Sequence, residues 1–244
     1  MSFFRKIFGL GPKEPMNVRP REKDTSIKKT HKTSTSSDED ISGRKIYPTL
    51  VSQKTREFEL EGELMAIFHE REGLFANVLI GHVMIDENKV ENGEVDIYQV
   101  RTFDKNEEEH DQIRLTGETN FDDFEVPFIP WNPTDDALNY QVLSCKISFL
   151  SSEKVLSKKH MDEAHKLLNA EELLVSIPRK GLIFVCSRDL SEEDYNHFLH
   201  LHASIVLQEN NELELLCEDL FVFKDGKMEG SFELKQLSEI LLKS

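Results

Sequence analysis

The chain is poor in cysteine and has no long hydrophobic run, and both shortages exclude classes of protein. Its 244 residues hold three cysteines, Cys145, Cys186 and Cys217, which lie far apart and form no C-x-x-C pair. Such a set argues against a disulfide framework or a zinc ribbon and favours a reducing compartment. No stretch approaches the ~20 apolar residues that span a bilayer, and the opening MSFFRKIFGLGP lacks the long apolar core of a secretory signal. We therefore expect a cytoplasmic protein.

The motifs of common catalytic and nucleotide sites are also missing. There is no G-x-S-x-G, no P-loop and no dinucleotide-binding G-x-G-x-x-G. The run 69–73 begins like the zinc motif H-E-x-x-H but has glycine in place of the second histidine. The run 104–115 begins like a calcium loop, but Glu109 replaces the turn glycine and Leu115 replaces the bidentate glutamate. We expect no cofactor, and the sequence favours a non-enzymatic role.

Charge is abundant but unevenly placed. The formal net charge is −16; residues 1–45 carry eleven Lys/Arg and six Asp/Glu, whereas residues 46–244 carry nineteen and forty. The first part is therefore at +5 and the second at −21. A body this acidic repels phosphate backbones, so we expect no nucleic-acid binding and favour a protein partner with a basic surface.

Composition divides the chain into three regions. Residues 1–10 form a short amphipathic segment, and residues 11–45 are rich in Pro, Lys, Ser and Thr with few large apolar side chains. Such a stretch cannot offset its ordering entropy, so we predict a disordered linker. Residues 46–244 then form an acidic α+β domain, with a possible division into two sub-domains near 134–150.

The amphipathic segment is a candidate docking element. Phe3, Phe4, Ile7 and Phe8 fall on one helical face, and glycine and proline follow at once. Two interpretations stay open beside an inert segment: weak peripheral contact with a membrane through residues 1–10, or docking on a partner protein.

The hydrophobic pattern predicts a mixed or largely antiparallel sheet with hairpins, covered by about three helices. Asn92-Gly93 and Asp225-Gly226 are expected hairpin turns, and Ser191 is expected to begin a helix through a capping box. The acidic run 104–125 is expected to be a loop, and 126–133, with its three prolines, an edge or irregular segment. The expected strands are 58–68, 74–85, 96–103, 172–177, 182–187, 213–217 and 219–223, and the expected helices are 151–169, 192–203 and 232–243.

Three segments resemble a known family. They are the opening Ile46-Tyr47-Pro48, ELLVSIPRKGLIFVCSRD at 172–189 and DLFVFKDGKMEGSFEL at 219–234. In their order over about residues 46–234 they resemble the bacterial family known as domain of unknown function 1444. The resemblance implies no particular activity.

One group of residues on the expected helix 192–203 is a candidate metal site. On a helix, Glu193, His197 and His200 share a face and would be plausible metal ligands. The opposite face is a normal core stripe, so we expect these three side chains in solvent and His202 in the core. Cys186, at the end of an apolar strand, is expected to be a buried small hydrophobe rather than a nucleophile.

The sequence thus favours a non-catalytic protein-interaction module. A toxin-neutralising, immunity-type role fits the acidic charge, which steers association with basic enzyme clefts. The alternative is an enzyme, such as a hydrolase, whose active site is assembled from residues far apart in the sequence.

Overall fold

The computed structural model describes residues 43–52, 78–86, 97–100, 105–133, 138–145, 150–208, 211 and 213–233. These residues form two antiparallel sheets with helices, which confirms the predicted α+β class. Several predictions lie outside the described residues: the amphipathic segment, most of the linker, strand 58–68, the Asn92-Gly93 turn and nearly all of helix 232–243.

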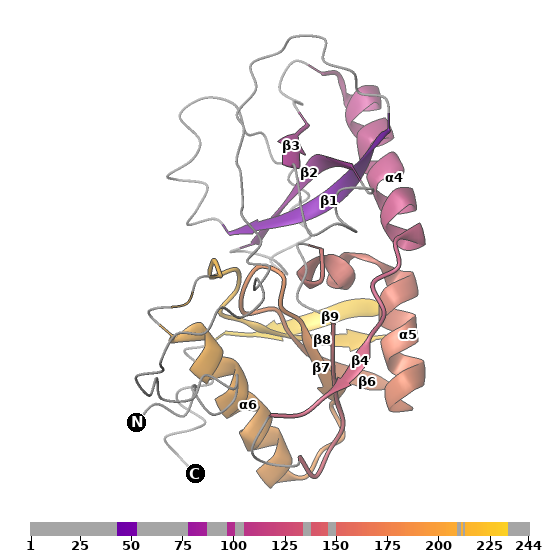
Figure 1. The fold of residues 1–244 in the computed structure, drawn as a ribbon. Coiled ribbons are helices and arrows are strands. Elements are labelled where there is room, and N and C mark those ends of the chain that lie inside the picture. The colour runs from indigo at the N-terminus through magenta and orange to yellow at the C-terminus, as the bar shows by residue number, and fades with distance from the viewer. Residues whose placement is uncertain are drawn as a thin grey trace, which may run out of the picture.

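The smaller sheet has the order β1-β2-β3 and carries one long helix. Its elements are β1 (Arg44–Ser52), β2 (Val78–Asp86), β3 (Ile97–Gln99) and helix α4 (Glu107–Asp123). Figure 1 shows α4 lying along this sheet. The expectation of a loop over 104–125 is therefore wrong. Asn106 caps the helix and forms a reciprocal capping box with Glu109, a signal that the abundance of acids obscured.

The larger sheet has the order β4-β5-β7-β6-β8-β9, and every neighbouring pair is antiparallel. Its strands are β4 (Ile129–Trp131), β5 (Val142–Ser144), β6 (Glu172–Ser176), β7 (Phe184–Ser187), β8 (Leu220–Lys224) and β9 (Lys227–Phe232). The predicted edge character of 126–133 is confirmed by β4, and the predicted hairpin at Asp225-Gly226 joins β8 to β9.

Two helices cover opposite faces of the larger sheet. Helix α5 (Lys158–Leu168) buries Met161 and Ala164 against side chains of one face, and α6 (Glu192–Val206) buries Phe198 and Leu199 against the other. Alternation along the strands explains this: Leu173 and Val175 face α5, whereas Leu174 between them faces α6. The sheet is therefore buried on both faces, as its continuous apolar strands indicate.

Three predicted boundaries are corrected. The helix expected over 151–169 is interrupted at Ser157, which ends the 3₁₀ helix η1 (Ser152–Leu156) and caps α5 by accepting from the His160 N–H. The expected strand 213–217 is absent; Leu215 makes only an isolated bridge with Arg179. Helix α6 continues three residues beyond the expected Ala203. Among the helices described, none is long and apolar enough to cross a membrane.

Candidate functional site

Two buried, oppositely charged residues connect the two sheets. Glu153 lies in η1 and Lys180 in the turn between β6 and β7, and their carboxylate and ammonium form an ion pair. Both also bind β1: Lys180 Nζ donates to the Leu50 carbonyl at 2.7 Å, and Glu153 Oε1 accepts from the Leu50 N–H at 2.9 Å. We call Glu153 and Lys180 the edge clamp, because they satisfy backbone groups that β1, an edge strand, cannot pair within its own sheet.

Pro48 fits the same edge. In an antiparallel strand, alternate residues turn their backbone groups to the same side. The backbone N–H and C=O of Leu50 point away from β2, so the backbone groups of Ile46 and Pro48 do as well. Asn120 of α4 donates to the Ile46 carbonyl at 2.9 Å. Proline has no N–H to leave unpaired, and a strand edge is therefore where it is tolerated.

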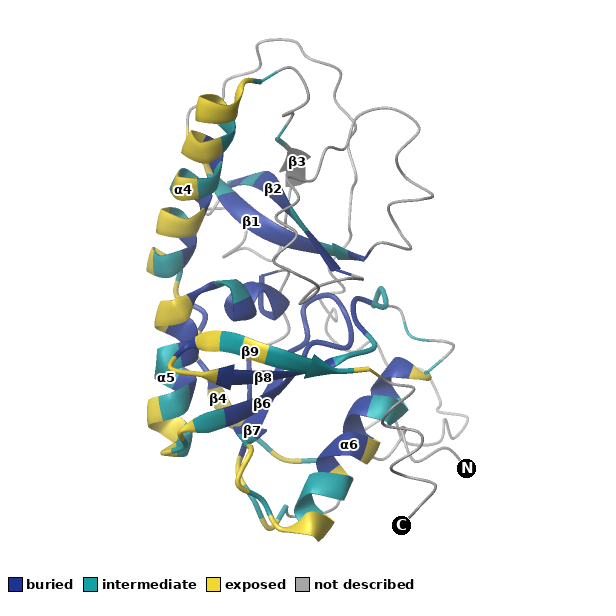
Figure 2. Cartoon of the chain, turned by 180° about the vertical axis from the view of Figure 1, so that it is seen from behind, coloured by how far each residue is buried: buried dark blue, intermediate teal, exposed yellow. Residues whose placement is uncertain are grey.

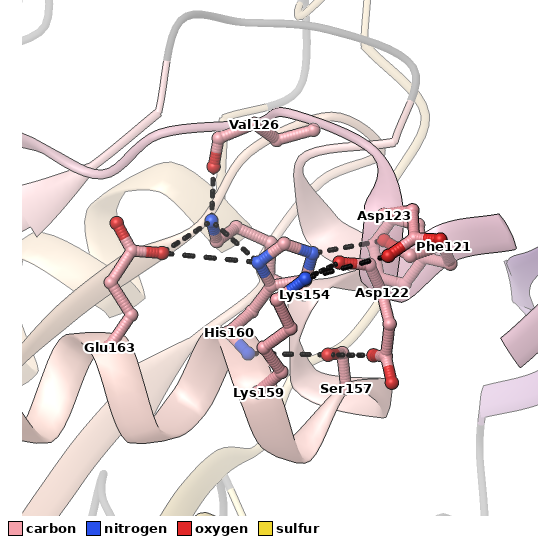
Figure 3. Close-up of polar contacts among 9 residues, drawn as sticks. All are labelled: Phe121, Asp122, Asp123, Val126, Lys154, Ser157, Lys159, His160 and Glu163. Carbon is pink, nitrogen blue, oxygen red and sulfur yellow. Dashed lines mark hydrogen bonds and ion pairs between the residues drawn. The ribbon is translucent and has the colours of Figure 1, made fainter. Parts of the chain in front are cut away.

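A second buried cluster surrounds Lys154, the residue after Glu153. Its ammonium donates to the Val126 carbonyl and lies 3.4 Å from His160 Nδ1 and 3.6 Å from Glu163 Oε2. It also stands 4.0 Å from the centre of the Phe128 ring. Figure 3 shows the carbonyl, the imidazole and the carboxylate converging on the ammonium. The Lys154 ammonium thus has two hydrogen-bond partners and a carboxylate as counter-charge, and its side chain has no solvent exposure.

The imidazole of His160 is fixed in one protonation state by its neighbours. Its Nε2 lies 3.1 Å from the Phe121 carbonyl, which can only accept, so Nε2 carries the hydrogen and Nδ1 accepts from Lys154. Burial, and then the charge of Lys154, lower the pKa of His160. Burial also lowers the pKa of Lys154.

The same cluster joins α4 to α5. The Ser157 hydroxyl donates to the Asp122 carboxylate, and Lys159 Nζ donates to the Asp122 carbonyl, at the end of α4. The contact of His160 with the Phe121 carbonyl adds a third link (Figure 3). The Lys154 cluster therefore contains residue types that catalysis uses, but their polar atoms are committed to holding two helices together.

The predicted metal candidates do not converge in the structure. Glu193, His197 and His200 are all exposed on α6, as expected of side chains in solvent. Within the described ranges no group of three or more His, Cys, Asp or Glu side chains is placed to hold a metal ion.

His202 is a core residue, as the sequence predicts. Its Nε2 donates to the Glu218 carbonyl at 2.9 Å and its Nδ1 lies 2.9 Å from the Ser176 hydroxyl. Burial lowers the pKa of His202 to about 4. Cys186 is likewise fully buried, and its burial raises the pKa of the thiol well above the ordinary value. Neither residue is poised for nucleophilic chemistry.

The outer side of α4 is strongly acidic. At ~100° per residue, Glu107, Glu108, Asp111 and Glu118 fall within an arc of about 100°, whose centre is about 130° from that of the buried stripe of the helix. All four are exposed. Figure 2 shows that much of the outward side of α4 is exposed. We call these four carboxylates the acidic face. Leu115 lies within the arc and is 50% exposed, so a single apolar side chain stands among the acids.

One arginine flanks the acidic face. Arg114 Nη1 lies 3.1 Å from Glu118 and Nη2 lies 3.4 Å from Asp111, which balances part of their charge. Over its seventeen residues α4 nevertheless has seven acids and this single Arg, with no Lys. The helix is held rigidly beneath, because Ile113, Gly117 and Phe121 are buried.

Sequence reasoning missed the edge clamp, the Lys154 cluster and the acidic face as such. The helix that carries the acidic face could have been predicted. Asn106 and Glu109 have the spacing of a capping box, and Ile113, Gly117 and Phe121 follow at intervals of four residues. No local sequence pattern indicates the edge clamp. Lys180 also donates to the hydroxyl of Thr49, which is 131 positions away.

No protein-family model, curated protein or solved structure matches the chain. The resemblance of residues 46–234 to domain of unknown function 1444 stays a prediction.

Proposed function

We propose that this chain is a cytoplasmic, non-catalytic module that binds a protein with a basic surface through the acidic face of α4. The observation that carries the proposal is the face itself: four exposed carboxylates around the exposed Leu115 on one side of a long helix. Binding sites between proteins commonly place an apolar anchor inside a polar rim. Leu115 supplies that anchor, and the four acids supply a rim of one sign.

Rigid support of the helix favours this role. The Asn106–Glu109 capping box fixes the start of α4, and the Asp122 contacts with Ser157 and Lys159 fix its end. A partner therefore meets carboxylates in a preset arrangement, which reduces the ordering entropy that association costs.

Charge supports the choice of a basic partner. The net charge of −21 on residues 46–244 and the charge of the acidic face are both negative. A positively charged protein is therefore attracted before direct contact, and its association rate rises. Toxin-neutralising proteins need this kind of steering, because they must occupy a basic enzyme cleft quickly. We propose this class of partner for the present chain.

The test compares two variants of the full chain as baits in extracts of its native cells. The first neutralises the acidic face through E107Q, E108Q, D111N and E118Q. The second, a matched control, neutralises four exposed carboxylates elsewhere through E171Q, E192Q, E193Q and E229Q. The proposal expects that the wild type and the control both retain a basic protein, and that salt releases it. The first variant is expected to bind that protein with an association rate at least about tenfold lower.

Two further results bear on the same test. Leu115→Ser is expected to weaken the retained complex without changing its salt dependence, because it removes the anchor and leaves the charges. Retention of the same partner by the face-neutralised variant and the wild type would refute the proposal. Circular dichroism of each variant checks that α4 stays folded.

A further inference from the structure

A hollow lies at the β4 edge of the larger sheet, away from the acidic face. Its volume is about 390 Å³, within the ~300–1,000 Å³ typical of ligand sites. On the α5 side it is lined by Phe128, Pro130, Leu143 and Leu167. Leu167, near the end of α5, is 50% exposed. An apolar side chain that faces the hollow is thus left in contact with water.

The other wall of the hollow is aromatic. It is lined by Trp131 and Tyr140, which pack against the core beneath α6. The Tyr140 hydroxyl is buried and has no hydrogen-bond partner among the described residues. Asn132 and Asn139 add amide groups at the rim. A ligand that supplied apolar side chains together with one backbone acceptor or donor would satisfy both the walls and this hydroxyl.

The edge strand favours docking by side chains over strand addition. Pro130 is the central residue of β4 and has no N–H to offer a further strand. Ile129 beside it is 47% exposed. An occupant therefore gains its affinity from apolar and aromatic contacts in the hollow rather than from a backbone ladder.

We propose that the chain's own amphipathic segment, residues 1–10, occupies this hollow. In a helical conformation the sequence of this segment would place Phe3, Phe4, Ile7 and Phe8 on one face, which would match an apolar and aromatic lining. It also belongs to the part of the chain at +5, which the part at −21 attracts. The inference does not depend on the acidic face, since the two surfaces share no residue.

The length of the connecting chain permits this contact. Between Phe8 and Gly43, where the described structure begins, lie 34 residues, which as a flexible coil would span roughly 30 Å and when fully extended roughly 110 Å. Covalent linkage of this kind gives an effective concentration of up to about 1 mM. A contact too weak to form between separate molecules is thereby occupied within one molecule.

The single tryptophan makes the inference measurable in the full chain. Trp131 lines the hollow and is the only tryptophan in the sequence, so its emission reports on this site alone. We compare the wild type with F4S/F8S, and expect the variant to emit at longer wavelength with an acrylamide quenching constant about twofold higher. As a matched control, K28Q/K29Q changes two residues before Gly43 but leaves residues 1–10 intact, and is expected to behave as the wild type.

A second variant tests the hollow itself. Leu167→Glu alters a half-exposed side chain, so the fold is expected to tolerate it. It should raise the quenching of Trp131 as F4S/F8S does, and combining the two changes should add nothing further, because both remove one contact. Additive effects, or equal quenching of Trp131 in the wild type and F4S/F8S, overturn the proposal.

Two other occupants are separated by the same measurements. If the emission shift depends on protein concentration, the segment of a second copy occupies the hollow and docking within one chain is overturned. If Trp131 is indifferent to F4S/F8S while the wild type alone sediments with vesicles of anionic lipid, residues 1–10 are a membrane contact and the proposal also fails. A concentration-independent shift that lipid does not abolish supports it.

Discussion

Lys180 and Glu153 neutralise each other's buried charge while both bind the backbone of Leu50, one at its carbonyl and the other at its N–H. The Ser152 hydroxyl donates to the second carboxylate oxygen of Glu153 at 2.7 Å. The pair therefore has hydrogen-bond partners on both sides, which is the condition under which a buried ion pair is tolerated. The pair therefore adds a polar link between the two sheets to the hydrophobic core that they share through Leu50 and Val78.

We predict that breaking this pair is costly. Lys180→Met leaves the Glu153 carboxylate buried without its counter-charge and the Leu50 carbonyl without its donor, which is expected to lower the free energy of unfolding by about 3–5 kcal/mol. Glu153→Gln should also be destabilising by a similar amount, because it leaves the Lys180 ammonium buried without its counter-charge, although the amide can still accept from the Leu50 N–H. Urea denaturation of the full chain measures both changes.

The control is the exposed pair Lys158–Asp162 on α5, whose ammonium and carboxylate lie 2.6 Å apart. Lys158→Met is expected to change stability by no more than about 0.5 kcal/mol, because water screens both charges. Equal effects of Lys180→Met and Lys158→Met would show that the edge clamp contributes nothing beyond a surface contact.

The edge clamp also shows where sequence reasoning stops. Strands β6, β7 and β8 were predicted because continuous apolar runs bounded by turn residues carry their own signal. Glu153 and Lys180 are 27 positions apart, and each binds the backbone of Leu50 more than a hundred positions away. A single sequence does not show which distant groups come into contact. A buried lysine and glutamate look like surface residues until the partner is known.

Helix α4 was missed for a different reason. Its buried stripe is a single row, Ile113, Gly117 and Phe121, and one member of that row is glycine. A Cβ at Gly117 would lie 3.0 Å from the ring of His82, so the helix approaches β2 too closely for an apolar side chain there. The hydrophobic periodicity is thereby weakened at the contact that positions the helix, and the acids around it were interpreted as a loop.

That close approach gives a second prediction. Gly117→Ala should gain up to about 1 kcal/mol from helix propensity but lose more by displacing the His82 ring or the helix. We expect a net destabilisation of about 1–2 kcal/mol. Leu115→Ala, on the exposed side of the same helix, is expected to be near neutral. A Gly117→Ala protein more stable than the wild type in thermal denaturation would mean that the contact is not tight.

Acid should destabilise the protein through its buried histidines. Burial lowers the pKa of His82 and of His202 to about 4, whereas an unfolded histidine titrates near 6.5. Below pH 6.5 the unfolded chain therefore binds protons that the native state does not bind. The stability present above pH 6.5 is lost as the pH falls toward about 4. Each histidine is expected to contribute a slope of up to about 1.4 kcal/mol per pH unit.

The measurement is urea denaturation across that pH window. His202→Gln keeps a donor for the Glu218 carbonyl but cannot titrate, so the pH slope of stability should fall by the share of one histidine. His197→Gln removes an exposed imidazole and should leave the slope unchanged. If the slope of His202→Gln equals that of the wild type, His202 is not the source of the acid sensitivity.

The β8–β9 hairpin offers a prediction that depends on the backbone geometry of its turn and on one close contact with α5. Asp225 and Gly226 have φ values of 50° and 70°, the left-handed pair that a two-residue turn between right-twisted strands requires. A Cβ on Gly226 would also lie 2.4 Å from the Asp162 carboxylate of α5. Gly226→Ala is therefore expected to lower the free energy of unfolding by about 1–2 kcal/mol, measured in urea.

Gly230, in β9, has nothing within 4 Å of its added Cβ, and Gly230→Ala should be neutral or stabilising because it reduces the entropy of the unfolded chain. Equal effects of the two substitutions would show that the turn tolerates alanine at position 226. The glycine would then not be what fixes the pairing of β8 with β9.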